Sequence, residues 1–437
     1  MKIFAVGGYD EIGKNMTCIE SEGEALILDI GLHIENLMGQ DYDVTSMTRK
    51  ELRQLEVLPD DRILEGIKDK VVGIVIGHGH LDHIGAVTKI AHTYDCPIFV
   101  TPFSAEILRG QCMEEKNYKL ERDIRVVKPG ETVRMGRSFS VEFVPAAHSI
   151  PDTTISAIHT EEGTVIYAND YKFDHDVTLG HETNTERLAE LGKAGVKALI
   201  FDTTRVERPG HTGNEDEAVQ KIRNAMAECD PEGGIIATTF ASHILRHQNI
   251  ILAATEMNRR VIFLGRSMEK YIACANRLGL LDLMGSRVFG RKNSMERALG
   301  KAEKKKFVFI VTGNQGEPNS VLDRISRGEL PYDFSKRNDS ILFCCEVIPT
   351  ETNRKCRDEL ERRLSPLAKN IFRDLHVSGH AAREDVRKML TLTKPEHVIP
   401  THGGRARLES ARDLALEEGF PDGNIHLLHD GEMLEIK

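Results

Sequence analysis

The chain has 437 residues, of which 40% are hydrophobic and 29% are charged. This balance is ordinary for a globular protein and excludes a disordered chain, a collagen-like fibre and a coiled coil. The formal net charge of −10 excludes a protein that binds nucleic acid through its overall charge, so any such contact must come from a local groove or from bound cations.

The sequence carries no signal for export or membrane insertion. The N-terminus, Met1–Phe4, passes straight into a strand-like stretch without the basic region and long apolar core of a signal peptide. No window reaches the roughly 18 consecutive apolar residues that span a bilayer. None of the eight cysteines forms a Cys-x-x-Cys pair, so we predict a reduced, cytoplasmic protein that does not enter a membrane.

Short apolar runs alternate with turn residues as far as about residue 200. They are rich in valine and isoleucine and are bounded by glycine, aspartate or proline, which is typical of strands. Helical patterns are fewer in this part of the chain. The predicted strands are Lys2–Val6, Ala25–Asp29, Val71–Ile76, Pro97–Val100, Val141–Val144 and Thr164–Ala168, and the predicted helices are Asp60–Lys68, Ala86–Thr93, Ser104–Leu120 and Thr185–Ala194.

From about residue 196 the pattern changes to a regular alternation of strands and helices, which predicts a parallel sheet flanked by helices. The tail returns to short strands and turns, at His397–Pro400, Asn424–Leu428 and Glu432–Ile436, and is expected to close the sheet of the first part. We therefore predict a first domain of residues 1–205 and 360–437, with a second, α/β domain of residues 206–359 inserted into it. The predicted strand and helix pairs are Ala198–Phe201 with Asn214–Glu228, Gly234–Thr239 with Ile244–Met257, Arg260–Leu264 with Met268–Leu278, Phe307–Val311 with Ser320–Arg327, and Ser340–Phe343 with Asn353–Leu364.

A dense group of potential metal ligands follows the predicted strand Val71–Ile76. The sequence there reads His78-x-His80-x-Asp82-His83. Three imidazoles and one carboxylate within six residues can face two adjacent cations. The alternative is a histidine-rich surface loop without metal. Such a loop does not explain why four potential ligand residues directly follow a buried strand. The pattern predicts a metal site with nitrogen and oxygen ligands.

Further ligand types stand just past other predicted strands. His148 follows the strand Val141–Val144, Asp170 follows Thr164–Ala168, and His402 follows the strand that begins at His397. Each alone is consistent with an ordinary loop residue. Together they occupy equivalent positions, where a sandwich gathers its loops, so we expect them to complete the metal site.

At these residues the sequence resembles the metallo-β-lactamase superfamily and, more narrowly, its nucleic-acid-processing β-CASP branch. Within that branch it is most similar to the ribonuclease J family in its short archaeal form, over essentially the whole chain. Stretches outside the motifs, such as Glu207–Gly210 and Thr312–Pro318, also resemble that family. Histidine at the last motif position goes with RNA processing in this branch. The matching motif residues are Asp29, the His78-x-His80-x-Asp82-His83 loop, His148 and Asp170, followed by Asp202, His380 and His402.

The resemblance implies an α/β fold: a metallo-β-lactamase αββα sandwich with an inserted β-CASP domain, whose parallel sheet is flanked by helices. It implies two divalent cations, with Zn²⁺ as the first expectation and Mn²⁺ and Mg²⁺ as alternatives, because no thiolate ligand selects zinc. Asp29 is expected to orient the ligand loop from behind. By resemblance, His78, His80 and His148 hold one ion, Asp82, His83 and His402 hold the other, and Asp170 bridges both.

His380 is the expected general acid. It belongs to neither of the two expected sets of cation ligands, and Asp202 can keep its ring protonated and correctly oriented. We expect Asp82 to act in catalysis as well as in metal binding. Two adjacent cations suit phosphodiester hydrolysis, because they generate hydroxide near neutral pH and neutralise charge that develops on the phosphate.

The resemblance also implies a pocket for the 5′-terminal phosphate of single-stranded RNA. Such a pocket favours 5′-to-3′ exonucleolysis of RNA with a 5′-monophosphate, in RNA decay or maturation, and leaves additional endonuclease activity open. Four arginines, Arg246, Arg266, Arg405 and Arg407, are candidates for further phosphate contacts. The expected pocket residues are Ser242, Ser378, Gly379 and His380.

Three features depart from the family pattern. The motif that contains Asp170 reads Asn169-Asp170, where the family has Gly-Asp. His243 and Leu245 stand where the family has asparagine and histidine, which puts the nucleotide contacts of this segment in question. The C-terminal domain of bacterial members, which helps their subunits associate, has no counterpart in the sequence, although a homodimer is still expected.

Two other functions stay open. One is an endoribonuclease of the cleavage-and-polyadenylation type, but its archaeal members carry additional N-terminal RNA-binding modules, whereas the catalytic pattern here begins at residue 3. The other is a non-catalytic RNA-binding scaffold, which the intact ligand set opposes. The ribosome, a helicase and other RNA-decay factors are partners among which the sequence does not decide.

Overall fold

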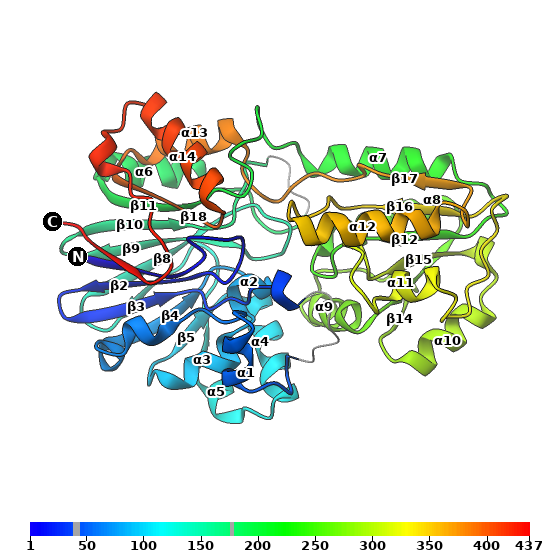
Figure 1. Ribbon diagram of the computed structural model, residues 1–437, viewed down its shortest axis with the longest axis horizontal. Coiled ribbons are helices and arrows are strands. Elements are labelled where there is room, and N and C mark those ends of the chain that lie inside the picture. Colours follow the sequence, from blue (N-terminus) through cyan, green and yellow to red (C-terminus); the bar gives the residue numbers. More distant parts are fainter. Residues whose placement is uncertain (38–43, 175–178) are drawn as a thin grey trace. The chain divides into compact units, whose positions relative to one another are not determined.

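The computed structural model describes residues 1–37, 44–174 and 179–437, and these divide into two compact units (Figure 1). The first unit holds residues 1–37, 44–174, 179–212 and 379–437. The second unit holds residues 213–378, a continuous stretch that separates two parts of the first in the sequence.

Two sheets form the centre of the first unit. Seven strands make one sheet, in the order β19-β1-β2-β3-β4-β5-β6, and six make the other, in the order β18-β11-β10-β9-β8-β7. The tail strand β19 pairs antiparallel with β1, so the two ends of the chain meet in one sheet. The strands of the first sheet are β1 (Lys2–Gly7), β2 (Met16–Ser21), β3 (Glu24–Leu28), β4 (Val71–Ile76), β5 (Ile98–Val100), β6 (Ile124–Val126) and β19 (Glu432–Glu435), and those of the second are β7 (Thr132–Met135), β8 (Phe139–Pro145), β9 (Thr154–Thr160), β10 (Gly163–Ala168), β11 (Val196–Asp202) and β18 (Pro395–Thr401).

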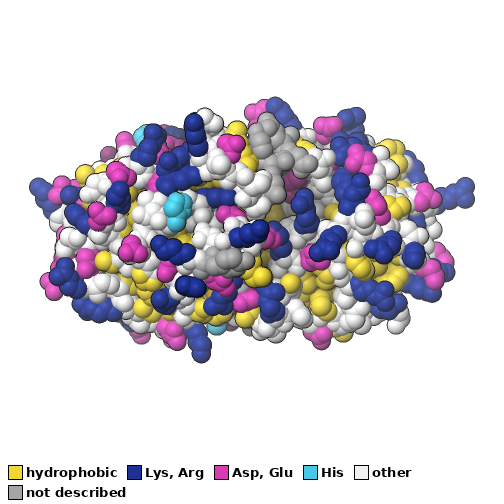
Figure 2. Space-filling view, turned by 90° about the horizontal axis from the view of Figure 1, so that it is seen from below, with side chains coloured by type: hydrophobic (Ala, Val, Ile, Leu, Met, Phe, Trp, Pro, Cys, Tyr) yellow, Lys and Arg dark blue, Asp and Glu magenta, His cyan; other side chains and the backbone are white. Residues whose placement is uncertain are grey.

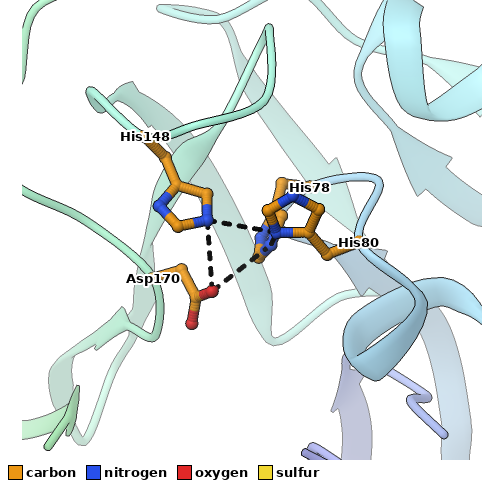
Figure 3. A group of neighbouring side chains, drawn as sticks. All are labelled: His78, His80, His148 and Asp170. Carbon is orange, nitrogen blue, oxygen red and sulfur yellow. Dashed lines mark hydrogen bonds and ion pairs between the residues drawn. The ribbon is translucent and has the colours of Figure 1, made fainter. Parts of the chain in front are cut away.

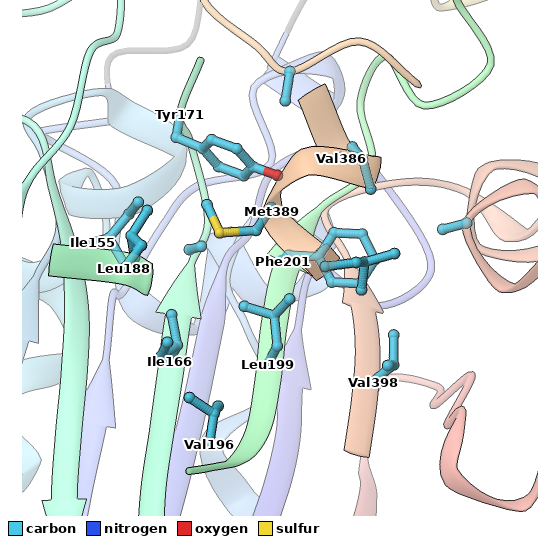
Figure 4. Packing of buried hydrophobic residues seen from close by; sticks show 14 of the residues in the cluster. Ile155, Ile166, Tyr171, Leu188, Val196, Leu199, Phe201, Val386, Met389 and Val398 are labelled. Carbon is cyan, nitrogen blue, oxygen red and sulfur yellow. The ribbon is translucent and has the colours of Figure 1, made fainter. Parts of the chain in front are cut away.

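An apolar core joins the two sheets face to face. Successive side chains of a strand point to opposite faces, so Val165 and Ile200 lie in this core, whereas their neighbours Ile166 and Leu199 lie in a cluster on the outer face of the second sheet. Three helices cover that outer face (Figure 4). They are α6 (Thr185–Ala194), α13 (Arg383–Thr393) and α14 (Arg405–Glu417).

Helices also accompany the other sheet (Figure 1). The resulting αββα sandwich confirms the predicted fold of this unit. These helices are α1 (Arg49–Gln54), α2 (Leu81–Ile84), α3 (Val87–Ile90), α4 (Pro102–Glu114) and α5 (Tyr118–Asp123), with 3-10 turns at Glu35–Leu37, Asp61–Leu64, Lys68–Lys70 and Ala91–Thr93.

The second unit is a parallel α/β structure. Its six strands have the order β14-β13-β15-β12-β16-β17, and every neighbouring pair is parallel. The predicted strand–helix alternation is confirmed. Its strands are β12 (Ile235–Thr238), β13 (Arg260–Leu264), β14 (Arg287–Phe289), β15 (Phe307–Val311), β16 (Ser340–Phe343) and β17 (Asn370–Phe372), and its helices are α7 (Glu215–Ala227), α8 (Ile244–Glu256), α9 (Arg266–Arg277), α10 (Lys292–Lys301), α11 (Val321–Ser326) and α12 (Glu351–Leu364).

Several elements differ from the sequence prediction. The predicted helix Ser104–Leu120 is two helices, α4 and α5, and the predicted helix Asp60–Lys68 contains only a 3-10 turn at Asp61–Leu64. The predicted strand Asn424–Leu428 is wrong, because this stretch contributes only one isolated bridge, between Ile425 and Val398. The strands β2 and β9 are not among the examples that the sequence prediction names. All of β2 and residues 154–158 of β9 are buried, polar and apolar residues alike.

In the part of the chain that the structure describes, no helix has the length and apolar character needed to cross a bilayer. On the face drawn in Figure 2, lysine and arginine side chains are interspersed with aspartate and glutamate side chains. This face therefore carries no broad field of one sign, in keeping with the expectation that nucleic acid is not bound through bulk charge.

Candidate metal centre

The predicted ligands come together at the ends of strands in the first unit. His78 and His80 lie in the loop that follows β4, and Asp82 and His83 lie in the short helix α2 directly after it. The other three predicted ligands follow strands of the second sheet. The chain segments after β8, β10 and β18 each place one potential ligand beside this loop. These three residues are His148, Asp170 and His402.

One group of ligand atoms consists of three histidines and a carboxylate. His80 Nδ1 lies 3.0 Å from His78 Nε2 and 3.1 Å from His148 Nε2. Asp170 Oδ2 lies 3.5 Å from His78 Nε2 and 3.3 Å from His148 Nε2. Figure 3 shows the three rings and the carboxylate pointing toward one another. All four ligand atoms lie within 4.8 Å of one another, a spacing that can hold one metal ion.

A second group lies on the other side of Asp170. Its members are Asp82, His83 and His402, whose ligand atoms also lie within 4.8 Å of one another. Asp170 Oδ1 lies 3.4 Å from His83 Nε2 and 3.5 Å from His402 Nε2. The carboxylate of Asp170 therefore faces one group with each of its oxygens, which is the arrangement expected of a bridging ligand.

The protonation states of the first ligand group suit a cation. Burial lowers the pKa of His80 and of His148 to about 3, so both rings are neutral at pH 7. Burial raises the pKa of Asp170, but the rings of His83, His402 and His380 outweigh it, and the carboxyl remains ionised. Neutral imidazoles and an ionised carboxylate are the forms that coordinate divalent metals. In the second group, burial lowers the pKa of His83, but the carboxylates of Asp170, Asp82 and Asp29 outweigh it and raise that pKa well above its usual value.

Two unpartnered buried atoms support the same conclusion. Asp170 Oδ1 and His402 Nε2 are buried and have no hydrogen-bond partner among the described residues. A buried polar atom without a partner is costly, and a metal ion held by the second group would satisfy both atoms. His148 Nδ1 donates to the carbonyl of Gly379 at 2.7 Å, which leaves the lone pair of Nε2 directed at the first group. A Cβ at position 379 would lie 2.7 Å from this Nδ1, so the close approach requires glycine.

Asp29 supports the ligand loop from behind. It is fully buried and has the left-handed φ of 59°. Its Oδ2 lies 2.8 Å from His83 Nδ1, and its Oδ1 accepts the N–H of Gly77 at 2.9 Å. This contact sets which nitrogen of His83 faces the second group. The same Oδ2 accepts the hydroxyl of Tyr167 at 3.0 Å.

Replacing Asp29 by asparagine should weaken metal binding by roughly 10- to 100-fold, the range seen when a residue that orients a ligand is lost. The amide keeps the size of the carboxylate but removes the charge beside the His83 N–H. Competition against a chromophoric chelator measures the affinity, with Asp413→Asn, an exposed change on α14, as the matched control. Equal affinities for the two variants would contradict a supporting role for Asp29.

Asp202 and His380 form a pair beside the ligand groups. His380 Nδ1 lies 2.8 Å from Asp202 Oδ2, and Asp202 Oδ1 accepts the backbone N–H of Thr204 at 2.7 Å. Burial lowers the pKa of His380, but the carboxylates of Asp202 and Asp170 outweigh it and raise the pKa to about 9. The Asp202 and His380 side chains, with Asp170 and His402, also form a third set of atoms within 4.8 Å that sequence analysis did not predict.

Sequence analysis missed two residues that hold the site together. Asn15 Nδ2 donates to the carbonyl of Asp82 at 3.0 Å and lies 3.2 Å from His83 Nε2. Tyr167 links Asp29 to Asn169, whose Nδ2 donates to the Tyr167 hydroxyl at 2.8 Å. Asn169, which departs from the family pattern, thus helps to position Asp29 through Tyr167. Neither residue type carries a metal-ligand signature, and only their distances from the ligands identify them.

The residues expected to bind the RNA end belong to both units. Gly379 and His380 lie in the first unit, and Ser242 and Ser378 lie in the second, where both are buried. His243, which replaces the family asparagine, caps α8 by accepting the N–H of Arg246 at 3.4 Å. The half-buried Leu245 follows it in that helix.

The prediction that Arg246 contacts a phosphate is wrong. Its side chain is fully buried in the second unit. The guanidinium makes two hydrogen bonds to Glu215, at 2.6 and 2.9 Å, and donates to the carbonyl of Leu375 at 3.1 Å. A buried arginine needs such partners, so the residue serves the fold of this unit.

Three known domain families match parts of the chain. "Ribonuclease J, beta-CASP domain" matches residues 232–357, "Zn-dependent metallo-hydrolase RNA specificity domain" matches residues 368–427, and "Beta-lactamase superfamily domain" matches residues 51–229. Together these matches span both units.

Curated proteins named ribonuclease J are similar to the chain along its whole length. The one from Pyrococcus abyssi is 40% identical, with 100% of this chain and 97% of that protein covered. The one from Methanocaldococcus jannaschii is 38% identical, with 100% and 99% covered. A crystal structure of a protein of unknown function from Enterococcus faecalis V583 has a TM-score of 0.65 at 17% identity, over 99% of both chains, which shows a shared fold alone.

Proposed function

The chain belongs to the ribonuclease J family, and on that basis we propose that it removes nucleotides one by one from the 5′ end of single-stranded RNA, with a preference for 5′-monophosphate ends. Family membership and the matching metallo-hydrolase domains make it a metal-dependent hydrolase that acts on RNA. The observation that carries the finer proposal is Asp170, whose two oxygens face two separate ligand groups next to the pair of Asp202 and His380.

We propose two divalent cations per chain, with Zn²⁺ as the first choice and Mn²⁺ and Mg²⁺ as alternatives. When bound, two such cations supply a nucleophile near neutral pH and neutralise the charge that develops on the phosphate. His78, His80 and His148 would hold one cation, and Asp82, His83 and His402 the other. Asp170 would contact both, and Asp29 would keep the ring of His83 oriented.

His380 would give a proton to the leaving 3′ oxygen of the terminal nucleotide. Asp202 engages Nδ1, so Nε2 is the nitrogen that would deliver the proton. Asp202 also fixes the plane of the ring, because Thr204 holds its other oxygen through both the backbone N–H and the hydroxyl. Loss of a proton to the product would require the ring to be protonated beforehand, and the two neighbouring carboxylates favour that form.

By family resemblance, the 5′-monophosphate preference would involve Gly379 and His380 of the first unit and Ser242 and Ser378 of the second. Hydroxyl and backbone N–H groups bind a phosphate oxygen well, and glycine lets the backbone approach it closely. A pocket that accepts only a terminal phosphate fixes the cut at the first linkage, which yields mononucleotides in the 5′-to-3′ direction. We also propose a homodimer in the cytoplasm, with the ribosome, a helicase and other RNA-decay factors as the partners to test.

The test uses RNA labelled at its 5′ end, with either a monophosphate or a triphosphate there, in buffers with Zn²⁺, Mn²⁺ or Mg²⁺. We expect labelled mononucleotide as the first product, formed faster from the monophosphate RNA, and no product after chelation. Internal fragments as the first products would favour an endoribonuclease. An absence of cleavage by protein with measured bound metal would favour a non-catalytic scaffold.

A further inference from the structure

Thr212 makes two hydrogen bonds to the backbone around His380. Its hydroxyl donates to the carbonyl of His380 at 2.7 Å and accepts the N–H of Ala382 at 3.0 Å. The side chain is almost completely buried, with 8% of the residue exposed. One hydroxyl thus bridges the residues on both sides of Ala381, and all of these residues lie in the first unit.

Asp385 in turn holds Thr212. Its Oδ2 accepts the N–H of Thr212 at 2.7 Å and the N–H of Ala382 at 3.2 Å, and its Oδ1 lies 2.8 Å from Nδ1 of His211. The carboxylate is buried in the first turn of α13, where it also caps the helix. Hydrogen bonds from backbone N–H groups to an ionised carboxylate are stronger than those between neutral groups, so Thr212 is firmly placed.

The loop that ends at Thr212 runs along the start of α13. Arg205 forms a parallel bridge with Ala382, and the N–H groups of Arg383 and Glu384 donate to the carbonyls of Arg208 and Gly210 at 3.0 and 3.1 Å. These contacts join residues 205–212 to the chain just after His380. The Asp202 side chain holds the ring of His380 at one end, and Thr212 holds its carbonyl at the other.

We propose that Thr212, fixed by Asp385, is a positioning residue that sets the place of the His380 ring for proton transfer. The inference rests on the proposed function, in which His380 protonates the leaving oxygen. Proton transfer needs a heavy-atom distance of about 2.6–3.2 Å, and a displacement of about 1 Å can cost roughly a hundredfold in rate. Without the hydrogen bond from Thr212, the backbone that carries the His380 ring can shift, and the ring can move relative to Asp202 and to the leaving oxygen.

The test compares Thr212→Val with Thr212→Ser on two RNA substrates. Valine keeps the shape but not the hydroxyl, and serine keeps the hydroxyl. One substrate is ordinary 5′-monophosphate RNA. The other carries sulfur in place of the bridging 3′ oxygen at the first linkage, where P–S cleavage releases a thiolate that needs no proton.

For Thr212→Val we expect kcat on ordinary RNA to fall by roughly 10- to 100-fold, at unchanged KM and metal content. Cleavage of the sulfur substrate should stay within about twofold of the parent protein, since it bypasses the acid. Thr212→Ser should behave as the parent on both substrates. If Thr212→Val does not fold, Thr212→Ala, which introduces no new methyl group, carries the same expectation.

Equal loss on both substrates, or loss accompanied by reduced metal content, would show that Thr212 serves only the fold and would overturn the proposal. An unchanged rate on ordinary RNA would overturn it as well. His380→Ala, measured in parallel, separates the two levels of inference. If His380→Ala slows ordinary RNA cleavage and Thr212→Val does not, only the positioning role fails. If His380→Ala has no effect, the proposed acid and its positioning residue fail together.

Discussion

Replacing Asp170 by asparagine is expected to lower metal affinity by at least about a thousandfold and to abolish RNA cleavage. The side chain is 1% exposed and each oxygen faces a different ligand group, so its charge acts on both proposed cation positions. Two unit charges 4 Å apart interact by about 4 kcal/mol at an effective dielectric constant of about 20, which corresponds to roughly three orders of magnitude in affinity. The asparagine amide keeps the shape of the carboxylate but lacks its charge, so it loses the electrostatic attraction to a cation at both positions.

Metal content after dialysis, measured by mass spectrometry, and release of labelled nucleotide check this expectation. Asp413→Asn is again the matched control, because it removes the same charge from an exposed position of the same unit. Chelated samples of both variants should unfold at similar temperatures if the change acts through the metal. If Asp170→Asn kept its full metal content and full activity, the proposed bridging role of Asp170 would be contradicted.

Replacing His380 by alanine is expected to lower kcat on ordinary RNA by about 10²- to 10⁴-fold, the usual contribution of a general acid. Metal content should not change, because the ligand groups formed by His78, His80 and His148 and by Asp82, His83 and His402 do not include this residue. RNA affinity should change less than kcat. Added imidazole should restore part of the rate, since the side chain is 23% exposed and its removal leaves a space that solutes can enter.

Single-turnover cleavage, metal analysis and RNA binding to the chelated protein separate these effects. A variant that loses metal together with activity would assign His380 to metal binding, through the third set of ligand atoms that it forms with Asp170, Asp202 and His402. A variant with normal kcat and weakened RNA binding would assign it to the phosphate pocket alone. His429→Ala provides a control, because this exposed histidine contacts Asp10 rather than Asp202.

The sequence was most informative where one short segment carried the whole signal. The loop after β4 and the helix α2 place four potential ligands within six residues, directly after a buried strand, and local geometry alone keeps them together. The sequence was less informative at β2 and at residues 154–158 of β9, where polar and apolar residues are buried alike. Prediction failed at Arg246, because arginine is usually exposed and only the contact with Glu215 explains its burial.

The sequence by itself determined the class of protein, the donor types of the metal site and the residues that could supply them. The family resemblance already implied that Asp170 bridges two ligand groups. Only the tertiary structure decided that Tyr167 and Asn15 support the ligand loop and that Thr212 holds the backbone of His380. The physical reason is that ligand chemistry is a property of each side chain, whereas hydrogen bonds between distant residues depend on sheet register and on which strand ends meet. A threonine 168 residues away from His380 becomes its neighbour only when the sheet is complete.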